Sequence, residues 1–159
     1  MSANPAQRAR LTDWLIRSVM SRPAVAVAET ATLTDALRAF TLSGLHHLVV
    51  IDSEGYCTGL LADRTIAGVW ALDPMCFDEV AVGRILGPEA PVVTGSATIA
   101  QAARVMHRLG TDAVVVVDGA GRPLGVLTAG DLIALLAKPP TVDRTPLTGA
   151  QPVADAVAS

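Results

Sequence analysis

The chain has 159 residues, with 12 basic and 15 acidic side chains and a formal net charge of −3. This weakly acidic balance disfavours nucleic acid as the main partner, because surfaces that bind nucleic acids concentrate positive charge. Apolar residues make up 51% of the chain and charged residues 17%, a composition that supports a folded core and argues against global disorder.

The N-terminal segment lacks the apolar run of a signal peptide, and no stretch of about 18 apolar residues occurs, so we expect neither secretion nor a membrane span. The two cysteines, Cys57 and Cys76, are too few for a disulfide framework. A cytoplasmic protein with reduced thiols is therefore expected.

The sequence contains one pattern twice. A shift of 66 residues aligns residues 24–66 with residues 90–132 without a gap, and 13 of the 43 pairs are identical. The identical pairs include Thr32/Thr98, Gly44/Gly110, Asp52/Asp118, Gly55/Gly121 and Gly59/Gly125. These residue types start helices, close turns and allow close backbone contacts, so the two copies share an architecture.

Each copy begins with a short extended stretch, at residues 25–27 and 91–93, followed by a helix. Thr32 and Thr98 are the predicted helix caps, and a glycine at 44 or 110 ends each helix. Along the helices, apolar residues recur every three or four positions, which predicts one buried stripe on each.

A continuous apolar strand comes next, at residues 48–51 and 114–117. Because its side chains do not alternate in polarity, we expect both faces of this strand to be buried. A tight turn leads to a second strand, at 58–61 and 124–127, and a second helix completes a β-α-β-β-α unit.

One such unit is too small to bury both faces of its sheet. The sequence therefore predicts an α/β (α+β) fold in which two units pack sheet to sheet about a pseudo-twofold axis, with ligand clefts between them. An apolar stripe also predicts a helix over residues 7–20. The expected boundaries are 1–15 for an N-terminal helical arm, 16–72 for the first unit, 73–82 for a linker, 83–137 for the second unit and 138–159 for a disordered tail.

The doubled unit resembles the cystathionine-β-synthase (CBS) domain family, arranged as a tandem pair. The most specific signal is the strand-to-helix junction GVLTAGD at residues 125–131, which matches the family pattern G-x-x-[T/S]-x-x-D. Residues 17–23 and 44–50 also look like the first copy of the family. Since little besides the pair is present, the chain is similar to the stand-alone bacterial CBS-pair proteins.

The junction has two interpretations that do not exclude each other. Thr128 and Asp131 have the spacing of a capping box, and the backbone N–H groups of a helix start also attract phosphate. The resemblance implies that Asp131 binds a ribose and Thr128 lies near a phosphate. It also implies that adenine lies against Val92, Val93 and the start of the strand at Asp112.

The first copy departs from this pattern. Ala62 stands in the place of the threonine and Thr65 in the place of the aspartate. Asp63 is displaced by two positions, about 200° around a helix, so it does not simply substitute. We therefore predict at most one competent site per chain, built on the second copy.

Several polar side chains are candidate contacts for such a ligand. The resemblance implies that basic residues at His46 and His47 reach phosphates, but neighbours on a strand point to opposite faces, so at most one of the two enters the cleft. Arg64 and Arg122 are further candidate phosphate partners, although an exposed arginine is more often only solvated. Asp112 either accepts a hydrogen bond from the adenine amino group or repels phosphate.

The sequence carries no P-loop, G-x-S-x-G or HExxH motif, so we expect no catalytic residues, no resident cofactor and no metal site. The expected function is a regulatory sensor for an adenosine-containing nucleotide, of the AMP, ADP, ATP or S-adenosylmethionine class. The alternative is a ligand-free dimeric scaffold that docks a partner. In both cases the resemblance implies a homodimer acting on an unknown regulated protein, with Phe40, Met106 and Leu109 available for the dimer contact.

Overall fold

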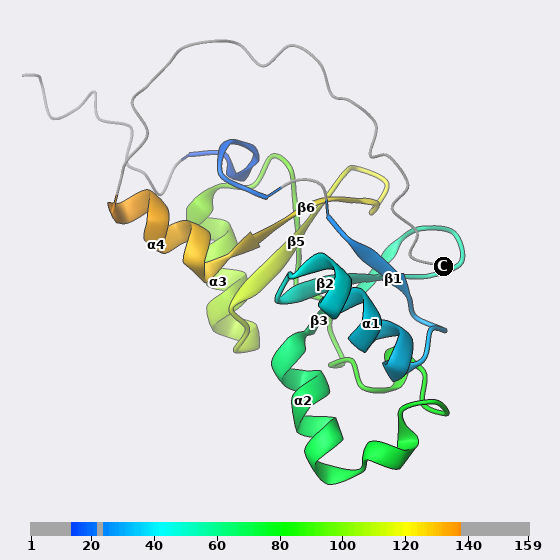
Figure 1. Cartoon of the computed structure of the whole chain (residues 1–159). Helices are drawn as coiled ribbons and strands as arrows, with labels where there is room; N and C mark the ends of the chain where they lie inside the picture. Colours follow the sequence, from blue (N-terminus) through cyan, green and yellow to red (C-terminus); the bar gives the residue numbers. More distant parts are fainter. Residues whose placement is uncertain (1–13, 22–23, 138–159) are drawn as a thin grey trace, which may run out of the picture.

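The computed structural model describes residues 14–21 and 24–137, and it consists of two β-α-β-β-α units (Figure 1). The first unit comprises β1 (Ala26–Ala28), α1 (Leu33–Ser43), β2 (His47–Ile51), β3 (Cys57–Ala62) and α2 (Asp63–Leu72). The second comprises β4 (Val92–Thr94), α3 (Ile99–Leu109), β5 (Ala113–Val117), β6 (Pro123–Thr128) and α4 (Ala129–Ala137). Short 3-10 helices lie before and between the units: η3 (Ile16–Ser18), η4 (Pro74–Cys76) and η5 (Val82–Arg84). The predicted order of elements is confirmed.

Each unit contains a three-stranded sheet with its strands in chain order. In both sheets the first two strands are parallel and the last two antiparallel. The register shifts at Val50 in β2 and at Val116 in β5, so even this irregularity repeats at equivalent positions. Every residue of β5 is buried, as the unbroken apolar strand predicts.

The first helix of each unit starts with a capping box. The Thr32 hydroxyl oxygen accepts from the Asp35 backbone N–H, and the Asp35 carboxylate accepts from the Thr32 N–H. Thr98 and Gln101 form the same pair of bonds at α3. The glycines that follow these helices have φ values of 66° and 64°, which favour glycine because a Cβ is strained there.

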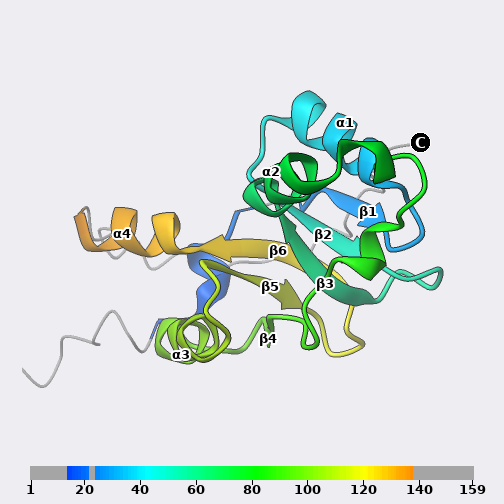
Figure 2. The ribbon, with the colours of Figure 1, turned by 90° about the horizontal axis from the view of Figure 1, so that it is seen from below.

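The two sheets face each other, and the helices lie on their outer sides (Figure 2). One cluster of buried side chains belongs to both sheets: Val49, Ala113, Val115, Val117 and Val126. Two further clusters fill the space between each sheet and the helices of its own unit. The sheet-to-sheet packing predicted from the small size of one unit is thus confirmed.

Residues 14–21 precede the first unit in the sequence but pack on the second. Leu15 forms a β-bridge with Thr98, and Ser21 forms one with Val126. Ile16 is fully buried in the core of the second unit. The contact is close at Gly125, where a Cβ would lie 2.7 Å from the backbone oxygen of Ser21.

The segment before the second unit makes the reciprocal contact. Ala81 forms a β-bridge with Thr32 of the first unit. Val82, which matches Ile16 under the 66-residue shift, is fully buried in the core of the first unit. Each unit is therefore completed by the chain segment that precedes the other one.

This crossing explains why the helix predicted over residues 7–20 is wrong in its described part. Leu15 and Ser21 are held in β-bridges, and between them the chain forms only the short η3. Residues 1–13, most of the expected helical arm, and the tail at 138–159 lie outside the described residues. Among the described residues, no helix is both long enough and apolar enough to span a membrane.

Candidate functional site

Thr128 ends β6, and Asp131 lies in the first turn of α4. The Thr128 backbone N–H donates to Oδ2 of Asp131 at 2.9 Å, and the Asp131 N–H donates to Oγ1 of Thr128 at 3.1 Å. The capping interpretation is therefore confirmed. Because these two bonds leave aside Oδ1 of Asp131 and the hydroxyl hydrogen of Thr128, capping is compatible with contact to a ligand.

Asp112 connects this junction to the first unit. Its backbone oxygen accepts from the Ala129 N–H at 2.7 Å, which places Asp112 at the same edge of the sheet as Thr128. Its carboxylate accepts two hydrogen bonds from the Arg64 guanidinium, at 2.8 and 2.9 Å. Nε2 of His47 lies 3.0 Å from the same carboxylate.

This network fixes the charge of Asp112. The hydrogen bond from Arg64, and then that from His47, hold the pKa of the Asp112 carboxyl well below its usual range, although partial burial acts in the opposite direction. The carboxylate is therefore ionised at neutral pH, and it pairs with the guanidinium of Arg64 and the imidazole of His47 from the other unit. The sequence did not predict this pair, because it depends on how the two units are placed in space.

The two adjacent histidines lie in different surroundings: His46 immediately precedes β2, and His47 is its first residue. The His46 side chain is 80% exposed, and its Nδ1 lies 2.7 Å from Oδ2 of Asp63. This hydrogen bond lowers the pKa of Asp63. The His47 side chain is 11% exposed and points toward Asp112, so His47 is the histidine that reaches the space between the units.

The first-unit junction differs in geometry as well as in sequence. Ala62 provides no side-chain cap for α2, and Asp63 pairs with His46 instead. Arg64 extends across to Asp112. The equivalent of the Thr128/Asp131 pair is therefore absent from this junction, which presents a guanidinium to the second unit.

The other residues predicted to contact a ligand differ in exposure and in position. Val92 is 37% exposed, but Val93 is 8% exposed and belongs to the core of the second unit. Arg122 precedes β6 and stacks over the Tyr56 ring at 5.1 Å. It lies at the opposite end of β6 from Thr128, about 20 Å away at the usual rise of a strand, so it does not reach a ligand held at the Thr128 junction.

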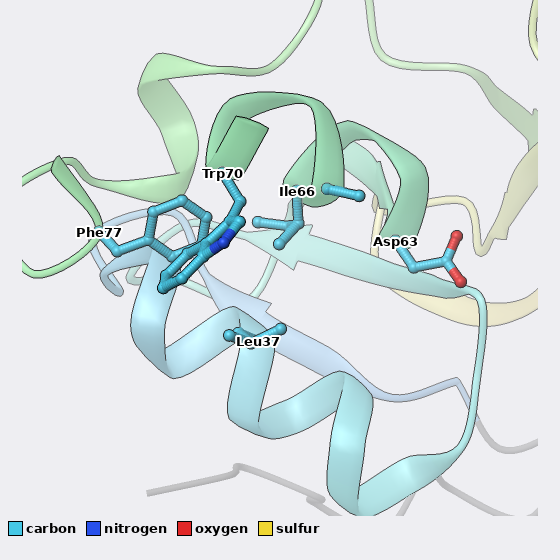
Figure 3. A pocket seen from close by; sticks show the side chains of 6 residues that line it. Leu37, Asp63, Ile66, Trp70 and Phe77 are labelled. Atoms are coloured by element: carbon cyan, nitrogen blue, oxygen red, sulfur yellow. The ribbon is translucent and has the colours of Figure 1, made fainter. Parts of the chain in front are cut away.

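A separate cavity of about 330 Å³ opens between α1 and α2 on the outer side of the first unit (Figure 3). It is lined by Leu37, Asp63, Ile66, Ala67, Trp70 and Phe77. The rings of Trp70 and Phe77 meet edge to face, with centroids 4.9 Å apart. Asp63 lies at the far end of the cavity from these rings in Figure 3, so most of its wall is apolar.

The outer helix faces also correct one expectation. Phe40 and Met106 are 7% and 6% exposed, so the prediction that they are available for a dimer contact is wrong: both point into the cores of their own units. The exposed apolar side chains on the second helices are Trp70, Leu72, Ile133 and Leu136.

The described residues contain no group of three or more His, Cys, Asp and Glu side chains that could hold a metal ion. Cys57 and Cys76 are both free thiols. Burial raises the pKa of the Cys57 thiol to about 11, so this thiol stays protonated at neutral pH and is a poor nucleophile.

The doubled unit also matches a known family model. The model of the CBS domain matches residues 16–71 and again residues 82–138. The chain belongs to the CBS domain family. Its two units are a tandem CBS pair, and Thr128 lies at the strand-to-helix junction of the second CBS domain.

Curated relatives fall into two groups. A CBS domain-containing protein of Dictyostelium discoideum is 25% identical over 135 residues, which cover 78% of this chain and 92% of the relative. Homoserine O-acetyltransferase of Methanosphaerula palustris is 25% identical over 130 residues, 82% of this chain but only 26% of the enzyme. The chain thus spans about a quarter of the length of that enzyme.

Solved structures of CBS pairs have the same fold. The CBS pair of protein MJ0100, in complex with 5′-methylthioadenosine and S-adenosyl-L-methionine, has a TM-score of 0.69 at 19% identity. The similarity covers 78% of this chain and 96% of that one. CBSX2 in complex with AMP has a TM-score of 0.65 at 22% identity, covering 79% of this chain and 97% of that one.

Proposed function

We propose that this CBS pair is a regulatory module that binds an adenosine-containing ligand between its two units, at the junction of β6 and α4. The observation that carries the proposal is the Asp131 carboxylate, whose Oδ2 closes the capping box while Oδ1 takes no part in it. A carboxylate accepts hydrogen bonds from both hydroxyls of a ribose. The adenosine ligands of MJ0100 and CBSX2, which share this fold, support the ligand class.

The proposed role is regulation rather than catalysis. A ligand regulates only when it binds one state of the protein more tightly than another. Here the Asp112 carboxylate and the shared core join the two units, so a ligand between the units acts directly on their relative position. The free thiols of Cys57 and Cys76 fit a reducing compartment such as the cytoplasm.

Calorimetric titration tests the ligand class. The purified protein is titrated with adenosine, 5′-methylthioadenosine, S-adenosylmethionine, AMP, ADP and ATP, with guanosine as the control that keeps the ribose and changes the base. We expect at least one adenosine compound to bind with one site per chain, and guanosine to bind at least about tenfold more weakly. An absence of heat with all six compounds, together with an unchanged thermal midpoint, would contradict the proposal and favour the ligand-free scaffold.

We also propose that the module is a homodimer formed by the outer faces of α2 and α4. Trp70 and Leu136 occupy equivalent positions under the 66-residue shift and are 53% and 70% exposed. Ala67 and Ile133 are also equivalent, and Ile133 is 66% exposed. Both units thus present apolar side chains at matching sites, and a second copy of the chain offers the same two faces in return.

Light scattering checks the dimer. The wild type is expected at twice the 16.4 kDa chain mass, and the double variant Trp70→Glu, Leu136→Glu at the mass of one chain, because two buried charges on each side prevent the contact. Leu15→Glu is the control, since Leu15 is 50% exposed and lies outside both helices. A monomeric wild type, or an undisturbed dimer in the double variant, would show that these faces are not the contact.

A further inference from the structure

We infer that the site prefers an adenosine compound without phosphate groups, and that Asp112 is the residue that sets this preference. The inference rests on the proposed adenosine site and specifies its ligand class. It follows from what the cationic side chains near the junction are already bonded to.

The basic side chains that would bind a phosphate already have other partners. Arg64 gives two hydrogen bonds to the Asp112 carboxylate, and Nε2 of His47 lies against the same group at 3.0 Å. His46 pairs with Asp63. Arg122 lies at the far end of β6, over Tyr56. Each of these four candidate partners is thus held by a carboxylate of the chain or placed beyond reach.

Asp112 stands where a phosphate would bind. Two oxygens that accept from a guanidinium fork and from an imidazole are the arrangement that a phosphate makes with Arg and His. The backbone of Asp112 is bonded to the first residue of α4, so this internal anion lies beside the junction that contains Asp131. A bound phosphate would have to displace the Asp112 carboxylate from Arg64 or lie close to two carboxylates.

The local charge instead favours adenosine compounds whose 5′-substituent is neutral or cationic. The carboxylates of Asp112 and Asp131 outnumber the single Arg64 guanidinium beside this junction. A neutral 5′-substituent meets no repulsion there, and a sulfonium or ammonium group is attracted. The matching ligands are adenosine, a neutral 5′-thioether of adenosine, or a cationic sulfonium such as S-adenosylmethionine.

The removal of one charge tests the inference. Asp112→Asn frees Arg64 and His47 for an external anion, and because the Asp112 side chain is 42% exposed the variant is expected to fold. The control is Glu89→Gln, which removes the same charge from a pair of equal geometry: Arg108 donates to Glu89 at 2.8 Å twice. Wild type and both variants are titrated with 5′-methylthioadenosine, S-adenosylmethionine, AMP and ATP at one pH and ionic strength.

In the wild type, we expect 5′-methylthioadenosine or S-adenosylmethionine to bind at least about tenfold more tightly than AMP. The reason is the repulsion between the Asp112 carboxylate and a phosphate bound beside it near the protein surface. Asp112→Asn should shift the ratio toward AMP by about tenfold, while Glu89→Gln leaves it unchanged. Arg64→Gln is a second variant that should weaken AMP further without weakening 5′-methylthioadenosine.

The outcomes separate this inference from the proposed function. Tighter binding of AMP or ATP than of the phosphate-free compounds in the wild type would overturn the inference alone, as would an unchanged ratio in Asp112→Asn. No binding of any adenosine compound would overturn the proposed function, and the inference would fail with it.

Discussion

Replacement of Ile16 by alanine is expected to loosen the second CBS unit, although Ile16 precedes the first unit in the sequence. Ile16 is fully buried among side chains of the second unit. Its truncation removes apolar contacts and leaves a cavity, which costs about 2–5 kcal/mol for a buried isoleucine. The matched variant is Val82→Ala, since Val82 is the equivalent residue and is fully buried in the first unit.

Hydrogen exchange measured segment by segment distinguishes the two variants. Ile16→Ala should lower protection in α3 and β6 more than in α1 and β3, and Val82→Ala should do the reverse, with a smaller loss because valine is smaller than isoleucine. If Ile16→Ala lowered protection mainly in the first unit, residues 14–21 would not complete the second unit, and the reciprocal crossing of the two segments would be wrong.

The second large effect is expected for Asp131→Ala, which should weaken binding of the adenosine ligand by about 10- to 100-fold or more. The variant removes the group that accepts from the ribose, and a hydrogen bond to a charged group contributes about 1.5–3 kcal/mol. It also removes the acidic member of a capping box, so the free energy of unfolding falls by about 1 kcal/mol.

Asp35→Ala separates these two effects. Asp35 accepts from the backbone N–H of Thr32 at 3.1 Å, the same bond that Asp131 makes with Thr128, but it lies at the start of α1. Asp35→Ala should therefore lower stability by a similar amount and leave ligand affinity unchanged. Equal affinities for wild type and Asp131→Ala, or an equal loss in both variants, would remove Asp131 from the ligand site.

Local sequence patterns predicted the architecture well. The Thr32 and Thr98 caps, the glycines after the helices and the apolar strands all depend on residues near each other in the chain. The 66-residue repeat then predicted a second sheet built like the first. By contrast, a helical stripe predicts a helix over residues 7–20, but in the described part of the chain Leu15 and Ser21 are held in β-bridges. The match of Ile16 to Val82 was the available signal, because it extends the repeat upstream of residue 24.

The sequence predicted which residues form the candidate site, but it did not predict which of them are hydrogen-bonded between the two units. Thr128 and Asp131 are close in sequence, so their pairing follows from helix geometry. The bond between Arg64 and Asp112 joins residues 48 positions apart and depends on how one unit lies against the other. Its sequence signal is an acidic residue at 112 and a basic one at 64, each at a position where the other copy carries no matching charge.

The most direct test of an adenosine site built on the second unit is a crystal structure of the protein with its tightest-binding adenosine compound. We predict one ligand per chain, with the ribose hydroxyls within hydrogen-bond distance of the Asp131 carboxylate and with the equivalent place at Thr65 empty. A ligand bound at the Thr65 junction, at both junctions alike, or in the cavity beside Trp70 would contradict the proposed site.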